Sequence, residues 1–191
     1  MPPPDEEAFR SRRADLVELA CPFERALLSR CAACSRARST LLAEREVIGC
    51  TSASASKRCR AYRSALREKA LFALRVDASA PWPFGKEIRL QCGGLIGLRE
   101  ALVEIDGQVG ETDGQAGETD GPVGETYGQV GETDAAVRGT DAPSGPTDPR
   151  VEDADTLMRA ALARYRTLDA LPFSLIMRSV TGYAPRRRVP R

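Results

Sequence analysis

Residues 53–74 read ASASKRCRAYRSALREKALFAL and form the clearest helical segment of this 191-residue sequence. Tyr62, Leu66, Ala70 and Leu74 recur at i, i+4, i+8 and i+12, which places them in one stripe along a helix. Basic residues cover the opposite side, where Glu68 is the one acidic residue. The pattern predicts an amphipathic helix whose apolar stripe packs into a core.

The segments on both sides of this helix also favour helices. Runs rich in Ala, Leu, Arg and Glu, with capping residues or prolines near their starts, predict helices over 6–19, 23–28, 35–48, 95–105, 153–165 and 171–183. Ile88, Leu90 and Cys92 alternate with polar residues and predict a short strand, and residues 72–76 offer a second one. The expected fold class is mainly α, a small helical bundle with at most a short β-hairpin.

An acidic repeat interrupts the chain between Gly107 and Asp148. It consists of six consecutive seven-residue units, of which the first four read GQVGETD, GQAGETD, GPVGETY and GQVGETD. A coiled coil needs two apolar positions in each heptad and helix formers between them, whereas these units are rich in glycine. Low hydrophobicity and negative charge instead predict a long disordered acidic loop.

This loop divides the chain into three parts. We expect a basic, cysteine-rich helical part at 1–105, the disordered insert at 106–150, and C-terminal helices with a basic tail at 151–191 that complete the same domain. The net charge of +1 conceals this division, because residues 1–100 carry 18 basic and 12 acidic side chains and residues 101–150 carry 2 and 11. The part expected to fold is therefore basic.

The sequence contains no histidine. This excludes Ser-His-Asp and Cys-His catalytic arrangements and histidine-ligated metal sites, and no other catalytic residues stand out. The pattern favours a protein that is not an enzyme. No apolar run approaches the roughly 20 residues of a membrane span or forms a secretory signal, so we expect a cytoplasmic protein without a membrane partner. Thiols stay reduced in that compartment, which favours metal-binding or redox-active cysteines over a disulfide framework.

Five of the six cysteines lie within residues 21–59, with the spacing C-x9-C-x2-C-x15-C-x8-C. Four thiolates can complete a tetrahedral zinc site or hold an iron–sulfur cluster. The C-x2-C pair makes Cys31 and Cys34 the first candidate ligands, followed by Cys21 and Cys50, with Cys59 and Cys92 as alternates. An unbroken helix over 35–48 would separate Cys34 and Cys50 by about 20 Å, so this segment must break or an alternate must replace Cys50.

The sequence thus predicts a small metal-binding protein with a structural, electron-transfer or sensing role and an unidentified protein or redox partner. Single cysteines in helical surroundings favour an iron–sulfur cluster over zinc. Two other interpretations of the cysteines are buried structural thiols and a dithiol redox pair.

A second functional class is a non-enzymatic adaptor or a nucleic-acid-associated module. Its interaction surface would be the basic helix face and the arginine-rich tail, which could contact phosphates. The residues concerned are Lys57, Arg58, Arg60, Arg63, Arg67, Arg186, Arg187 and Arg188. No sequence motif of a nucleic-acid-binding domain accompanies them.

Overall fold

The structure is a computed structural model that describes residues 6–109 and 150–185. In chain order its elements are α1 (Glu6–Leu16), α2 (Glu24–Leu28), β1 (Ala37–Leu42), β2 (Arg45–Cys50), α3 (Ala53–Leu74), α4 (Phe84–Ile88), the π-helix η1 (Arg89–Gly93), α5 (Gly94–Val109), α6 (Ala154–Tyr165) and α7 (Phe173–Gly182). The chain is mainly α-helical with one small antiparallel sheet, as predicted.

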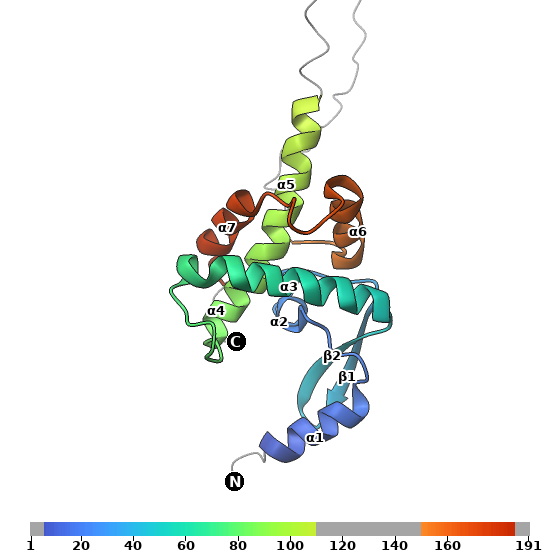
Figure 1. The fold of residues 1–191 in the computed structure, drawn as a ribbon. Coiled ribbons are helices and arrows are strands. Elements are labelled where there is room, and N and C mark those ends of the chain that lie inside the picture. The colour runs from blue at the N-terminus through green and yellow to red at the C-terminus, as the bar shows by residue number, and fades with distance from the viewer. Residues whose placement is uncertain (1–5, 110–149, 186–191) are drawn as a thin grey trace, which may run out of the picture.

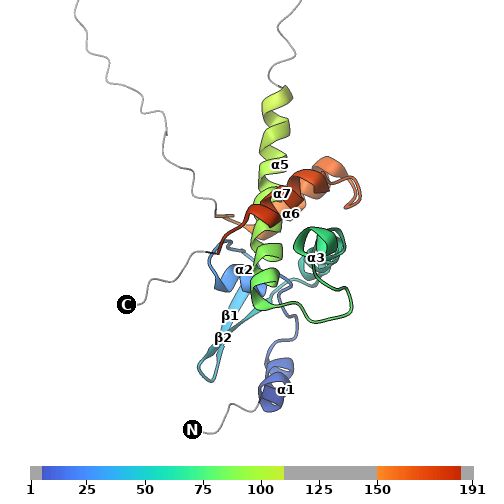
Figure 2. The ribbon, with the colours of Figure 1, turned by 90° about the vertical axis from the view of Figure 1, so that its left-hand side faces the viewer.

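The long helices α3 and α5 organise the molecule (Figure 1). Helix α3 crosses α5, and α6 and α7 lie beside α5 (Figures 1 and 2). Helix α1 and the β1–β2 hairpin lie at the opposite end of the molecule from the C-terminal end of α5. The α5 helix packs mainly against α7. Five of the six cysteines lie between the residues before α2 and the first half of α3, and Cys92 lies in η1.

The predicted stripe on α3 forms the centre of the core. Tyr62, Leu66 and Ala70 are fully buried, and Leu74 is nearly so. The Tyr62 hydroxyl donates to the carbonyl of Gly94 at 2.7 Å, which satisfies its polar end inside the core. Burial of this tyrosine raises its pKa well above the ordinary value. Helix α3 begins at Ala53, after the Ser52 cap, and ends at Leu74, so both its boundaries match the predicted range of residues 53–74.

The helix predicted over residues 35–48 is wrong, because this segment forms the β1–β2 hairpin. Leu42 pairs with Arg45 across a two-residue turn, and Ala43 adopts a left-handed φ of 54° there. Local composition favours a helix, but the β-branched Val47 and Ile48 are buried in the second strand. Their burial and the strand pairing outweigh the helix propensity of the neighbouring residues.

The strand predicted over residues 88–92 is also wrong, because α4, η1 and α5 follow one another as continuous helix. A Cβ atom on Gly93 would lie 2.5 Å from the Val180 Cα, and one on Gly94 would lie 2.5 Å from a Leu66 methyl group. These glycines permit neighbouring helices to pack closely. A Gly-Gly pair in a sequence is compatible with both close helix packing and a tight turn, so the sequence did not reveal which one forms. Residues 72–74 end α3 and form no strand.

Most of the acidic repeat, predicted to be a disordered loop, lies outside the described residues. Helix α5 continues to Val109 in the first repeat unit, and the chain is described again from Arg150. Val151 then pairs with Ala32 in a parallel bridge. None of the described helices is long and apolar enough to cross a membrane.

Candidate metal centre

An extended segment before α2 brings Cys21 close to Cys50. Ala20 pairs with Gly49 in an antiparallel bridge, so this segment lies alongside β2. The amide of Cys50 donates to the carbonyl of Leu19 at 2.7 Å. Two cysteines that are 29 positions apart in the sequence are thus held on neighbouring extended segments.

The hairpin brings Cys34 to the same place. Ala37 and Cys50 are register partners at its open end. The Ala37 amide donates to the carbonyl of Cys34 at 3.1 Å. Partners on antiparallel strands have Cα atoms about 5 Å apart, whereas a helix over these residues would have separated Cys34 and Cys50 by about 20 Å.

Cys21 and Cys34 each begin a tight turn of the same kind. The amide two residues later, from Phe23 or Arg36, donates toward the cysteine sulfur and opposes the rise in the thiol pKa that burial causes. The amide three residues later donates to the carbonyl of the cysteine, at 3.2 Å and 3.1 Å respectively. Amide groups directed at sulfur stabilise a thiolate, and in metal–thiolate sites they also tune the metal.

The N-terminus of α6 supplies a further amide to Cys34. The N–H of Asp155 donates to the Asp153 carboxylate at 3.1 Å and also faces the Cys34 sulfur, where it opposes the rise in the thiol pKa that burial causes. Asp153 caps this helix and accepts hydrogen bonds from the amide and hydroxyl of Ser35, both at 2.9 Å. The loop after Cys34 is thereby fixed to the start of α6, whose dipole favours negative charge.

Cys59 enters the cluster from α3. The pKa of its thiol is raised to about 12, mainly by burial and also by the negative charges of Cys34, Cys50 and Asp155, while Arg58 opposes the rise. Cys59 is 8% exposed and lies on the inner face of the helix. Cys59 was predicted only as an alternate ligand, but it belongs with the other three free cysteines.

The thiols interact with one another as well as with the protein. The pKa of Cys21 is raised to about 12, mainly by burial, with smaller contributions from Cys34, Cys59 and Cys50. Burial raises the pKa of Cys34 too, with contributions from Asp153 and Cys50. Buried, mutually repelling thiols of this kind are protonated at neutral pH unless a cation compensates their charge.

The described residues contain no preformed metal site. Within 6–109 and 150–185, no group of three or more His, Cys, Asp or Glu side chains has an arrangement that could hold a metal ion. The four free thiols lie near one another, but their sulfurs would have to move closer together to bind an ion. The Sγ of Cys50, for example, instead donates to the Ser52 carbonyl at 3.3 Å.

Positive charge gathers beside these thiols around a buried carboxylate. Asp155 is 2% exposed and pairs with Arg58 at 2.7 Å, Arg159 at 3.3 Å and Arg36 at 3.5 Å. Three guanidinium groups against the carboxylates of Asp155 and Asp153 leave this group of side chains with an excess of positive charge. A tetrathiolate zinc site carries a charge of −2, which such an excess would partly offset.

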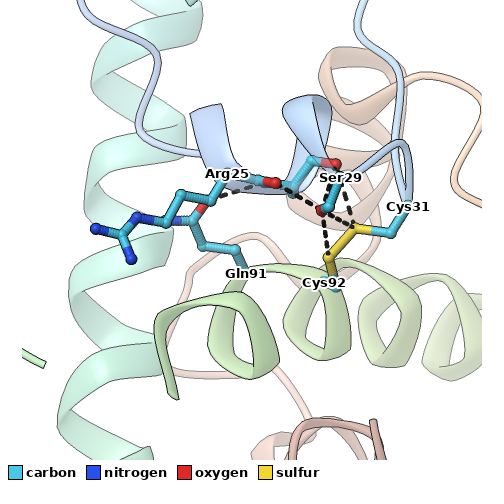
Figure 3. The surroundings of a disulfide bond; sticks show 6 residues. Arg25, Ser29, Cys31, Gln91 and Cys92 are labelled. Atoms are coloured by element: carbon cyan, nitrogen blue, oxygen red, sulfur yellow. Dashed lines mark hydrogen bonds between the residues drawn. A yellow bond between two sulfur atoms is a disulfide. The ribbon is translucent and has the colours of Figure 1, made fainter. Parts of the chain in front are cut away.

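Cys31 and Cys92 form a disulfide, contrary to the expectation that the cysteines are reduced (Figure 3). The bond joins the loop after α2 to η1, across 61 positions of the sequence. Neither cysteine presents a free thiolate in this structure. Of the six candidates, the structure therefore gathers Cys21, Cys34, Cys50 and Cys59 and separates Cys31 and Cys92 from them as a disulfide.

The basic face of α3 is largely engaged in ion pairs. Arg63 donates two hydrogen bonds to the buried carboxylate of Glu87, at 2.8 and 2.9 Å, and Arg67 donates one at 2.8 Å. Arg58 pairs with Asp155, while Lys57 and Arg60 are exposed. Arg186, Arg187 and Arg188 lie outside the described residues. Nucleic-acid binding by this face stays a prediction, and three of its arginines serve the fold.

Comparison of the chain with models of protein families, with curated proteins and with solved structures finds no match. The geometry of the chain itself is therefore the basis for a functional interpretation. The sequence analysis placed Cys59 among the alternate ligands and did not predict that Asp155 balances the charges of Arg36, Arg58 and Arg159. Cys59 lies three residues before the fully buried Tyr62, which would have been a signal, because Cys59, Tyr62 and Leu66 share one helix face.

Proposed function

We propose that this protein binds one metal ion, zinc, through the thiolates of Cys21, Cys34, Cys50 and Cys59. The observation that carries the proposal is the gathering of four free cysteines from four separate segments into one mutually interacting group. Two of them begin turns that direct backbone amides at sulfur. Neighbouring thiols and amide groups directed at sulfur are two features of a closed tetrathiolate site, and on binding the four sulfurs would converge around the ion.

A single ion is favoured over an iron–sulfur cluster because three of the four cysteines do not lie on helices. The expectation of a cluster rested on single cysteines in helical surroundings. The hairpin and the two turns give Cys21, Cys34 and Cys50 extended or turn surroundings instead. Zinc has no redox chemistry and takes four thiolates tetrahedrally, so a closed site of this kind is structural.

The structural role follows from the small apolar content of the hairpin. Leu42, Val47 and Ile48 are its buried apolar side chains, and Leu41 is 75% exposed. Such a small hydrophobic contribution stabilises a hairpin only marginally, and small domains commonly compensate with a metal. The ion would fasten the hairpin, the segment before α2 and α3 to one another.

Metal analysis of the purified full-length chain tests the proposal. We expect about one zinc per chain and, after exchange for cobalt, the intense visible absorption of a tetrahedral cobalt thiolate. Serine substitution at each of the four positions should abolish stoichiometric binding. The matched control is the Cys31→Ser/Cys92→Ser double variant, which removes two cysteines and should keep the metal.

A second measurement covers variants that fail to fold. Wild-type protein is titrated with a mercurial thiol reagent while a dye reports the zinc that is released. Release that follows modification of Cys21, Cys34, Cys50 and Cys59, mapped by peptide mass spectrometry, supports the site. Protein that contains neither zinc nor iron after anaerobic purification refutes it, and iron with sulfide would keep the ligands but replace the single ion by a cluster.

A further inference from the structure

We propose that the Cys31–Cys92 disulfide is a thiol–disulfide exchange site, at which an external thiol attacks the Sγ of Cys31 and Cys92 leaves as the thiolate. The external partner is a thiol or dithiol reductant. The inference concerns two cysteines outside the proposed metal centre and does not depend on that centre. It is carried by the unequal surroundings of the two sulfurs.

The first inequality is access. Cys92 is 0% exposed, within the π-helix η1, whereas Cys31 is only half-buried in the loop after α2. Exchange requires the attacking thiolate to reach one of the two sulfurs in line with the bond. Attack in the folded protein is therefore directed to Cys31, and Cys92 becomes the leaving group.

The second inequality is a hydroxyl group beside the leaving sulfur. The Oγ of Ser29 lies 3.4 Å from the Sγ of Cys92 and 3.8 Å from that of Cys31 (Figure 3). A thiolate that leaves from Cys92 can thus accept a hydrogen bond from Ser29. Ser29 also lies 2.6 Å from the carbonyl of Arg25, so its single hydrogen must turn from that carbonyl toward sulfur as the charge develops.

The reduced pair also finds hydrogen-bond partners already in place. Once released, the Cys31 thiol lies 3.3 Å from the Ala26 carbonyl, to which it can donate. The Cys92 thiol keeps Ser29 as its partner. Buried polar groups with ready partners avoid the cost of an unsatisfied donor, which stabilises the reduced state.

A separate hydrogen bond keeps the two sides of the site together. The side-chain oxygen of Gln91 accepts from the backbone amide of Ala26 at 3.2 Å, which fastens α2 to η1 (Figure 3). The Gln91 amide group in turn donates to Glu87 at 3.1 Å. Cleavage of the sulfur–sulfur bond therefore leaves α2 in position, and exchange does not require unfolding.

The chemistry balances in two exchange steps. In the first, the attacking thiolate forms a mixed disulfide with Cys31, and the Cys31–Cys92 bond breaks with its electron pair on Cys92, which takes up a proton. In the second, another reductant thiol attacks the sulfur of the reductant in the mixed disulfide, and Cys31 leaves as a thiol. The protein gains two electrons and two protons, and the reductant is oxidised to its disulfide.

Trapping of the mixed disulfide on the full-length chain tests the direction of attack. The protein is exposed briefly to glutathione, quenched in acid with N-ethylmaleimide under denaturing conditions, and mapped by peptide mass spectrometry. We expect glutathione on Cys31 and maleimide on Cys92, with at least about a tenfold excess over the reverse pattern. Glutathione mainly on Cys92 overturns the proposal.

Two further measurements separate native exchange from exposure by unfolding. The rate of reduction by dithiothreitol should stay nearly constant as urea is raised below the unfolding transition, and a steep rise overturns the proposal. Ser29→Ala should slow the reduction by about three- to tenfold, whereas Ser64→Ala, an exposed serine on α3, should leave it unchanged. Equal rates for wild type and Ser29→Ala would remove Ser29 from the site.

Discussion

The carboxylate of Asp153 accepts hydrogen bonds from both the amide and the hydroxyl of Ser35, across 118 positions of the sequence. It also receives the hydroxyl of Thr156 at 2.7 Å while it caps α6. One side chain therefore joins the turn that begins at Cys34 to the helix after the acidic repeat. The position of the Cys34 sulfur depends on this link, because the amide of Asp155 that faces it belongs to the same helix start.

The first prediction concerns the pH dependence of stability through Asp153. Burial alone would raise the pKa of this carboxyl, but the hydrogen bonds from Ser35, Thr156 and Asp155 outweigh it and lower the pKa from 3.8 to about 2. Because the folded pKa lies below the unfolded one, the stabilisation is present above pH 4 and is lost as the pH falls toward 2. Urea unfolding of wild type and Asp153→Asn should show a smaller loss over this interval in the variant. Equal slopes would contradict the assignment.

The sequence was sufficient to predict the parts of the fold that rest on helical periodicity. Residues 53–74 form the helix that their stripe indicated, and the C-terminal helices agree closely with the predicted ranges. Periodicity reports how a segment buries one face, and α3 buries the face with Tyr62 and Leu66. Elements decided by local packing in this way are accessible from sequence.

The hairpin and the composition of the thiol cluster could not be read in the same way. Residues 37–50 have helix-favouring composition, and their strands exist because Ala37 pairs with Cys50 and Gly49 pairs with Ala20. Pairing is a tertiary effect that propensities do not contain. The predicted ligand set included Cys31 because of its C-x2-C spacing, while the structure joins Cys31 to Cys92 through the close approach of α2 and η1.

The second prediction concerns the disulfide as a structural cross-link. The chain-entropy relation for a loop of this length gives a stabilisation of about 4 kcal/mol. The Cys31→Ser/Cys92→Ser variant should therefore unfold at lower urea than the oxidised wild type. Reduced wild type, which keeps both cysteines, is the control and should resemble the double variant. A stability unchanged on reduction would contradict the prediction.

The third prediction concerns the contact between η1 and α7. A Cβ atom at Gly93 would lie 2.5 Å from the Cα of Val180 and 2.6 Å from the carbonyl oxygen of Ser179, so backbone would have to move. Gly93→Ala should lower the free energy of unfolding by about 3 kcal/mol. Gly85→Ala is the matched control, because nothing lies within 4 Å of its added Cβ and alanine favours the α4 helix. Urea denaturation followed by circular dichroism measures both, and an equal effect of the two substitutions would refute the packing argument.

The fourth prediction concerns the buried carboxylate that organises the basic side of α3. Burial on its own raises the pKa of Glu87, but the hydrogen bonds and charges of Arg63, Gln91 and Arg67 outweigh it and lower the pKa. Glu87→Gln should lower the free energy of unfolding by about 3 kcal/mol, because it leaves the two arginines without their counter-charge. The control is Glu68→Gln, because Glu68 is an exposed residue of α3. This substitution should change the free energy of unfolding by less than about 0.5 kcal/mol. Urea titrations at pH 7 give both values, and a small effect at Glu87 would show that the arginines are adequately solvated without it.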